Sequence, residues 1–212
     1  MRVIDDKEKA KRLAAARNAM KNLDKLLKKK NTVIRLSDHQ EVDVECIPTG
    51  SISLDVACGG FGVARGRIVE LFGAESSGKS LICQRLIAAC QEQGGQCAYI
   101  DVEHTFDPKF ARKLKVDTDS LFVSQPDHMQ DTIKIVDALI DSQAFDIIVL
   151  DSIASLVPQE ELEEEAGKQT VGLVARYMSQ FLRRITPKLS KTGTVLVCIN
   201  QVRQKIGVNA AA

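Results

Sequence analysis

The residues best suited to chemistry lie in the stretch GAESSGKS, which runs from Gly73 to Ser80. Their spacing matches the pattern G-x-x-x-x-G-K-[ST], in which glycines let backbone N–H groups converge on phosphate oxygens at a helix N-terminus. Lys79 would pair with the β- and γ-phosphates of a nucleotide, and the Ser80 hydroxyl would bind Mg²⁺. If the stretch is a phosphate loop rather than an ordinary loop, the residues expected to contact the nucleotide are Gly73, Glu75, Ser76, Ser77, Gly78, Lys79 and Ser80.

Carboxylates follow two further apolar runs. FDIIVLDS ends its run at Asp151, where a carboxylate can hold Mg²⁺ directly or through water. AYIDVEHTFDP ends its run at Asp101 and carries Glu103, which we expect to orient or deprotonate the attacking water. Asp101, Glu103 and His104 could instead be metal ligands, although no further His or Cys cluster completes such a site.

Two amides end a third apolar run, VLVCINQ. Asn200 and Gln201 could sense the γ-phosphate from this position. An uncharged strand end is also an ordinary place for both residue types. The run therefore adds a candidate group without deciding its role.

The elements that must position these residues alternate along the chain from Ile47 onward. Apolar runs without polar alternation, separated by helical patterns, indicate an α/β fold with a mostly parallel sheet that helices cover on both faces. Ligands of such sheets bind at the carboxyl ends of the strands, where the candidate residues lie. We expect strands at RIVELF, CAYID, LFVS, DIIVLD and GTVLVCIN, and helices over Lys79 to about Gln93, DPKFARKL, DTIKIVDALIDS and about Val171 to Leu189.

An N-terminal arm over residues 1–36 precedes this core. Residues 1–30 carry eleven basic and four acidic side chains, so a basic arm precedes a mildly acidic body. Asp5 and Glu8 resemble a capping box, and TVIRL, Thr32–Leu36, reads as a short strand. The predicted helix has one apolar stripe, which packs either on its own domain or on a neighbouring subunit: Leu13, Ala16, Met20, Leu23 and Leu27.

Composition narrows the class of protein. The six cysteines form no C-x-x-C pair, so we interpret them as reduced core residues rather than as a zinc site or a disulfide framework. The charged start and the lack of any long apolar stretch predict a cytosolic protein without a signal peptide or membrane span. The acidic run EELEEE, Glu160–Glu165, is expected to be a solvated surface loop.

Several longer segments resemble the bacterial RecA recombinases, from about Lys9 to Val208. The resemblance implies a RecA-type P-loop ATPase core that uses ATP and Mg²⁺. It also implies a homo-oligomeric helical filament on single-stranded DNA, which pairs with homologous duplex DNA and exchanges strands in recombinational repair. The segments that carry it are PTGSISLD, GRIVELFGAESSGKS, AYIDVEHTFDPKFARKLKVD, SQPD, VLDSIASLVPQEELE, GLVARYMSQFLRR and INQVRQKIGV.

The resemblance also implies roles for single residues around the nucleotide. Glu103 falls on the catalytic glutamate of the family, and Asp107 and Phe110 fall on its adenine-contacting positions. Lys79 and Gln201 complete the catalytic set, with Gln201 coupling ATP to the order of the DNA-binding loops. Asp151 falls on the magnesium carboxylate.

The DNA-binding loops would be Glu163–Gly172 and a second loop that begins at Val202. Val171 falls where the family usually has a bulkier wedge between bases. By resemblance the DNA-backbone contacts are Arg176, Ser179, Arg183, Arg203 and Lys205. Arg176, Arg183 and Arg184 also recur at near-helical spacing, which is equally consistent with solvated helix positions.

Chains of the family continue well past QKIGV. We therefore expect a core over residues 37–208 that is incomplete at its C-terminal end, and a tail over 209–212 that is not native sequence. RIVELF would then be an exposed apolar edge strand. The alternative function is a truncated nucleotide-binding filament subunit that modulates a full-length recombinase. Another RecA-fold motor is a third possibility, which EHTFDP and INQVRQKIGV disfavour.

Overall fold

The computed structural model describes residues 5–38, 44–163 and 172–201, and the chain divides into two compact units, 1–43 and 44–212. Unit 1 contains the long helix α1 (Asp6–Leu26). The Asp5 carboxylate caps this helix by accepting a hydrogen bond of 2.7 Å from the backbone N–H of Glu8, as the sequence predicted. α1 buries none of its residues, so its apolar stripe has little packing within this unit.

The strand predicted over residues 32–36 is wrong. No strand forms there, and a short 3-10 helix, η1 (Leu36–Asp38), begins where it should end. The backbone N–H groups of Asn31 and Thr32 donate to the Asp24 carboxylate at 3.0 and 2.9 Å, which turns the chain after α1. A strand needs a neighbour for its backbone hydrogen bonds, and the described part of unit 1 supplies none, so a preference for β-structure is not enough.

Unit 2 contains a five-stranded sheet in which every neighbouring pair is parallel. The order across the sheet is β3 (Ile68–Gly73), β7 (Val195–Gln201), β6 (Ile147–Asp151), β4 (Cys97–Asp101) and β5 (Phe122–Ser124). The predicted α/β class and all five predicted strands are confirmed. Because all the strands run the same way, their carboxyl ends lie side by side at the same end of the sheet.

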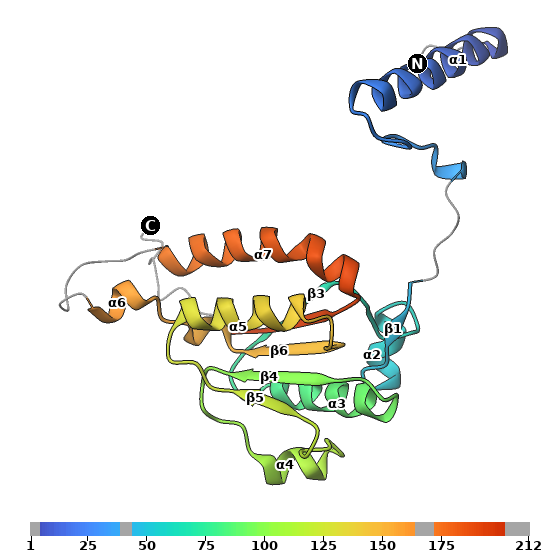
Figure 1. Cartoon of the computed structure of the whole chain (residues 1–212). Helices are drawn as coiled ribbons and strands as arrows, with labels where there is room; N and C mark the ends of the chain where they lie inside the picture. The colour runs from blue at the N-terminus through green and yellow to red at the C-terminus, as the bar shows by residue number, and fades with distance from the viewer. Residues whose placement is uncertain (1–4, 39–43, 164–171, 202–212) are drawn as a thin grey trace, which may run out of the picture. The chain divides into compact units, whose positions relative to one another are not determined.

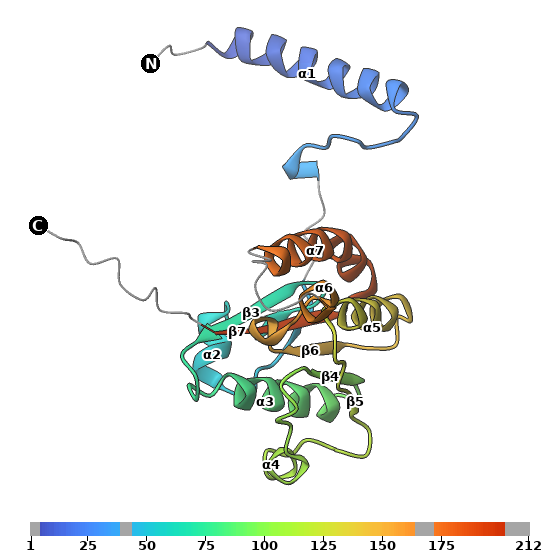
Figure 2. The same ribbon diagram turned by 90° about the vertical axis from the view of Figure 1, so that its left-hand side faces the viewer.

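Helices cover both faces of this sheet, as Figures 1 and 2 show: α3 lies on one face, and α5 and α7 lie together on the other. Successive side chains of a strand point to opposite faces, so the sheet contributes to two hydrophobic cores. Tyr99 and Val149 pack in the core on the α3 side. Ile100 and Leu150 pack in the core on the side of α5 and α7. The helices are α3 (Lys79–Glu92), α4 (Pro108–Lys113), α5 (Met129–Asp141), α6 (Gln159–Glu163) and α7 (Leu173–Thr192), with a 3-10 helix η2 (Ile153–Ser155) after β6.

Three local features differ from the sequence-based expectations. The acidic run expected as a loop begins in α6, where acidic side chains in the first turn favour the positive end of the helix dipole. A small antiparallel pair, β1 (Cys46–Ile47) and β2 (Val63–Ala64), was not predicted. Neither was the short helix α2 (Ile52–Ala57). Strands of two residues carry too little periodicity to be recognised.

Strand β3 lies at one edge of the sheet and pairs only with β7 among the described residues. Its Phe72 side chain is 70% exposed, so RIVELF forms the apolar edge that was expected. All six cysteines are free thiols, and Cys83, Cys90, Cys97 and Cys198 are buried. Among the described helices, none is long and apolar enough to cross a membrane.

Candidate nucleotide-binding site

The phosphate loop joins the end of β3 to the start of α3, as the pattern requires. Gly78 has φ of 90° and precedes the first helical residue, Lys79, so a residue with a side chain would be strained there. A Cβ atom on Gly73 would lie 2.9 Å from the Ser77 hydroxyl, which explains the first glycine. The Lys79 ammonium donates to the carbonyl oxygens of Gly73 at 3.2 Å and Ala74 at 2.7 Å, so its charge lies against the loop itself.

The two predicted magnesium ligands meet across the site. Ser80, the second residue of α3, donates a hydrogen bond of 2.9 Å to Oδ2 of Asp151, the last residue of β6. The hydroxyl of Tyr99 on β4 donates to the same oxygen. Burial raises the pKa of the Asp151 carboxyl, whereas these two hydrogen bonds oppose the rise. A hydroxyl and a carboxylate are the hard oxygen ligands that Mg²⁺ prefers, so the residues fit the expected ion.

The predicted catalytic carboxylate, Glu103, follows β4 and lies close to the end of β7. Its Oε1 accepts hydrogen bonds from Ser152 at 2.6 Å, Ser155 at 2.8 Å and the Gln201 side-chain amide at 3.1 Å. The structure thus brings Glu103 and Gln201 together. The two serines were not predicted from the sequence, and only their position in the four residues after the strand that ends in Asp151 could have pointed to them.

Two candidates from the same strand ends have structural partners instead. Asn200 donates a hydrogen bond of 2.9 Å to Glu70 on the neighbouring strand β3, so its amide points toward this outermost strand of the described sheet. Asp101 is fully buried and accepts backbone N–H bonds from Thr105 and Phe106, both at 3.1 Å. Asp101 therefore shapes the turn that presents Glu103, and no group of three or more metal-ligating side chains occurs among the described residues.

The two residues expected near adenine lie at the start of α4. The Asp107 carboxylate caps that helix by accepting from the backbone N–H of Lys109 at 2.8 Å. Phe110 is 40% exposed, so its ring is accessible from solvent. Neither position has a contact that tests the assignment.

The expected DNA contacts on α7 share one face of the helix. Arg176, Ser179 and Arg183 are exposed at a spacing of three and four residues. Arg184 lies on another face, where its guanidinium forms an ion pair of 3.3 Å with Asp137 of α5. Arg203, Lys205, Val171 and most of the first expected DNA-binding loop lie outside the described residues.

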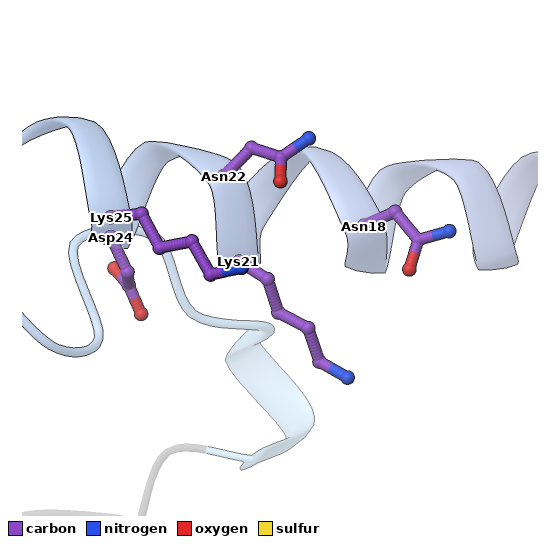
Figure 3. Close-up of a pocket in the computed structure, with 5 residues that line it drawn as sticks. All are labelled: Asn18, Lys21, Asn22, Asp24 and Lys25. Carbon is purple, nitrogen blue, oxygen red and sulfur yellow. The ribbon is translucent and has the colours of Figure 1, made fainter.

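A polar hollow in unit 1 is lined by side chains of α1 alone (Figure 3): Asn18, Lys21, Asn22, Asp24 and Lys25. Ligand pockets usually enclose their ligand on several sides. A hollow whose walls come from a single helix does not meet that description. The Asp24 carboxylate is also already bonded to the backbone that follows the helix.

Comparison with known proteins identifies the family. Residues 14–212 match the model of the RecA N-terminal domain. Three curated proteins named Protein RecA are similar: those of Bifidobacterium longum (52% identical, 93% of this chain, 50% of the relative), Arthrobacter sp. (50% identical, 92% and 58%) and Acinetobacter baylyi (49% identical, 96% and 57%). The chain thus spans about half the length of the curated relatives it matches. Together with the phosphate loop and the parallel sheet, these matches show that the chain belongs to the RecA family.

Proposed function

We propose that the chain works as an ATP-dependent recombinase that forms filaments on single-stranded DNA, pairs it with homologous duplex DNA and exchanges strands. One observation supports the proposal: the G-x-x-x-x-G-K-S loop, the contact between Ser80 and Asp151 and the contact between Gln201 and Glu103 all lie where the parallel strands end. The residues are Lys79, Ser80, Asp151, Glu103 and Gln201. The family relationship supports the same assignment.

ATP would bind with its phosphates on the N-terminus of α3. The loop N–H groups and the Lys79 ammonium would neutralise phosphate charge, and Ser80 and Asp151 would hold Mg²⁺. When bound, that ion would neutralise negative charge on the phosphates. Asp107 and Phe110 would border the adenine.

Glu103 would orient or deprotonate the water that attacks the γ-phosphate. Its hydrogen bonds with Ser152 and Ser155 fix the carboxylate from the β6 side. The Gln201 amide reaches the same oxygen from β7, immediately before the position where the second DNA-binding loop begins. If ATP binding or hydrolysis changes the hydrogen bonds of Glu103, the position of Gln201 would change as well. The DNA-binding loop that follows Gln201 would then become ordered or disordered with the state of the nucleotide.

DNA would bind through local side chains rather than through a global field, because the chain carries 29 basic and 28 acidic side chains. Arg176, Ser179 and Arg183 present two cations and a hydroxyl on one exposed helix face. Such a row of side chains is suited to contacts with the sugar–phosphate backbone, which position a protein on DNA without reading the base sequence. Arg203 and Lys205 would extend the contacts from the second loop.

The filament would form through unit 1. Residues 32–36 pair with no strand among the described residues, and the described sheet has edge strands that a neighbour's segment can extend. The apolar stripe of α1 would pack on the same neighbour. Such a head-to-tail contact is heterologous, so it generates an open helix unless the rotation closes a ring.

ATP turnover by this chain, measured with and without single-stranded DNA, tests the proposal. We expect DNA to stimulate turnover, because the Gln201 contact links the DNA-binding loop to the hydrolytic carboxylate. Nucleotide binding without turnover under either condition would favour the alternative, a nucleotide-binding filament subunit that modulates a full-length recombinase. Failure to bind nucleotide at all would contradict both.

A further inference from the structure

The hydroxyl of Tyr99 contacts the magnesium carboxylate although the phosphate-loop pattern requires no phenol there. We propose that Tyr99 is a positioning residue, which holds the Asp151 carboxylate in the orientation that binds hydrated Mg²⁺ and so sets the Mg²⁺ requirement of nucleotide binding. The inference rests on the proposed function, because it assigns a further residue to the same site.

The strand register places the phenol where it can do this. Tyr99 pairs with Val149, and Asp101 pairs with Asp151, so Tyr99 is two positions short of Asp151 on the adjacent strand. Residues two positions apart on a strand point to the same face. Tyr99 and Asp151 are therefore diagonal neighbours, a separation that a long aromatic side chain spans.

The ring is held in place before any ligand binds. Tyr99 is only 2% exposed, and the ring of Phe106 packs against it with centroids 4.8 Å apart and planes tilted by 53°. β4 is flanked by β6 and β5, so the backbone beneath the ring belongs to the interior of the sheet. The position of the hydroxyl is thus fixed by the framework rather than by the loop.

The phenol acts as the hydrogen-bond donor in its contact with Asp151, because an ionised carboxylate can only accept. Asp151 is 3% exposed, and a buried carboxylate needs donors to offset its lost hydration.

The two hydroxyl donors to Asp151 differ in what holds them. Ser80 and Tyr99 both donate to Oδ2. Ser80 belongs to the phosphate-loop helix and would itself bind the ion, so its orientation changes with the ligand. Tyr99 belongs to the sheet strand β4 rather than to the phosphate loop, although its hydroxyl also interacts with the Ser80 side chain. Its position is therefore set by the sheet, and it would hold the carboxylate in both states.

A purely structural role for Tyr99 makes a different prediction. If the ring merely fills the core and its hydroxyl merely finds a partner, Tyr99→Phe changes the melting temperature and leaves the Mg²⁺ dependence alone. If the hydroxyl orients Asp151, the same change raises the Mg²⁺ concentration that supports nucleotide binding. Phenylalanine keeps the ring and its packing on Phe106, so the substitution isolates the hydroxyl.

The experiment titrates Mg²⁺ into Tyr99→Phe and the parent with a fluorescent ATP analogue and reads equilibrium binding. A hydrogen bond to a charged group contributes enough for at least about a tenfold effect, so we expect the half-maximal Mg²⁺ concentration to rise about tenfold. Affinity in the presence of EDTA should be the same in both proteins. The matched control is Tyr177→Phe, since Tyr177 is the other of the two tyrosines and also donates to a carboxylate, that of Glu160 on α6.

A spectroscopic measurement provides a second readout that needs no change at Tyr99. The chain has two tyrosines and no tryptophan, so in Tyr177→Phe all tyrosine emission comes from Tyr99. A phenol bonded to a carboxylate has quenched emission, and Mg²⁺ draws electron density from that carboxylate. Emission should rise when nucleotide is added with Mg²⁺ and stay unchanged when the same nucleotide is added with EDTA.

The outcomes separate this inference from the proposed function. A parent that binds no nucleotide overturns both. A parent with a clear Mg²⁺ requirement that Tyr99→Phe leaves unaltered overturns the role of Tyr99 and leaves the proposed function standing. If Tyr99→Phe does not fold, the emission of Tyr177→Phe decides: a signal that is the same with Mg²⁺ and with EDTA, while nucleotide binds, overturns the inference.

Discussion

Replacing Glu103 by glutamine should stop ATP hydrolysis while nucleotide binding remains. The amide oxygen of glutamine can still accept the hydrogen bonds from Ser152, Ser155 and Gln201, so the side chain should keep its place. Each of these bonds weakens by about 1 kcal/mol when its acceptor loses its charge, which bounds the structural effect at about 3 kcal/mol. The chemical effect is separate: a positioned general base contributes about 10²- to 10⁴-fold to rate, or about 3–5 kcal/mol.

The assay compares ATP turnover at saturating Mg²⁺ and single-stranded DNA with equilibrium ATP binding. Turnover of Glu103→Gln should fall by at least about 10²-fold, and its dissociation constant should stay within about threefold of the parent value. Glu92→Gln is the matched control, because Glu92 is an exposed carboxylate at the end of α3 farthest from the phosphate loop. Equal turnover in Glu103→Gln and the parent would refute the catalytic role, and lost binding would show that Glu103 shapes the site instead.

Three further predictions concern DNA, assembly and stability. Arg176→Ala or Arg183→Ala should weaken binding to single-stranded DNA of any sequence, and each should reduce the slope of log K against log salt by about 0.7 per lost phosphate contact. Arg184→Ala is the control and should leave the slope unchanged, because Arg184 is already paired with Asp137 of α5. An unchanged slope in both Arg176→Ala and Arg183→Ala counts against the assignment. Deleting residues 1–43 should leave a folded nucleotide-binding unit that no longer sediments as filaments with nucleotide and DNA, and filaments that persist would place the connector elsewhere. Asp151→Asn should raise the melting temperature of the nucleotide-free protein at about pH 8, because burial raises the pKa of this carboxyl and its ionised form destabilises the fold; the gain should shrink toward about pH 4, and an equal gain at both pH values would contradict this reasoning.

Local spacing was enough to predict the phosphate loop and the parallel sheet. Residues Gly73–Ser80 carry their own geometry, since two glycines, a lysine and a serine at fixed offsets lie between a strand and a helix. The buried strands β4 and β6 are continuous apolar runs, so they stand out without knowledge of their neighbours. The approach of Asp151 and Ser80 followed from the rule that parallel strands end at one edge.

The features of the candidate site that were missed, and the strand that was wrongly predicted, depend on contacts between distant segments. Tyr99 reads as one more apolar residue of a buried strand until the register shows which carboxylate its hydroxyl meets. Ser152 and Ser155 are unremarkable turn residues until Glu103 is placed beside them. The segment over residues 32–36 has the composition of a strand but no partner in the described part of unit 1, and pairing is what makes a strand.

The central claim is that Gly73–Ser80 is the phosphate site of a nucleotide. The most direct test measures equilibrium binding of ATP with Mg²⁺ to the parent, to Lys79→Ala and to Lys191→Ala. Lys191 is an exposed lysine in the last turn of α7, near the amino ends of the strands, whereas the phosphate loop lies at their carboxyl ends. Its removal therefore changes the net charge without altering the site. The account predicts that the parent and Lys191→Ala bind alike and that Lys79→Ala binds at least about tenfold more weakly, because a charge-assisted contact to the phosphates is lost. Binding by Lys79→Ala at the parent's affinity would contradict the assignment of Gly73–Ser80 as the phosphate site.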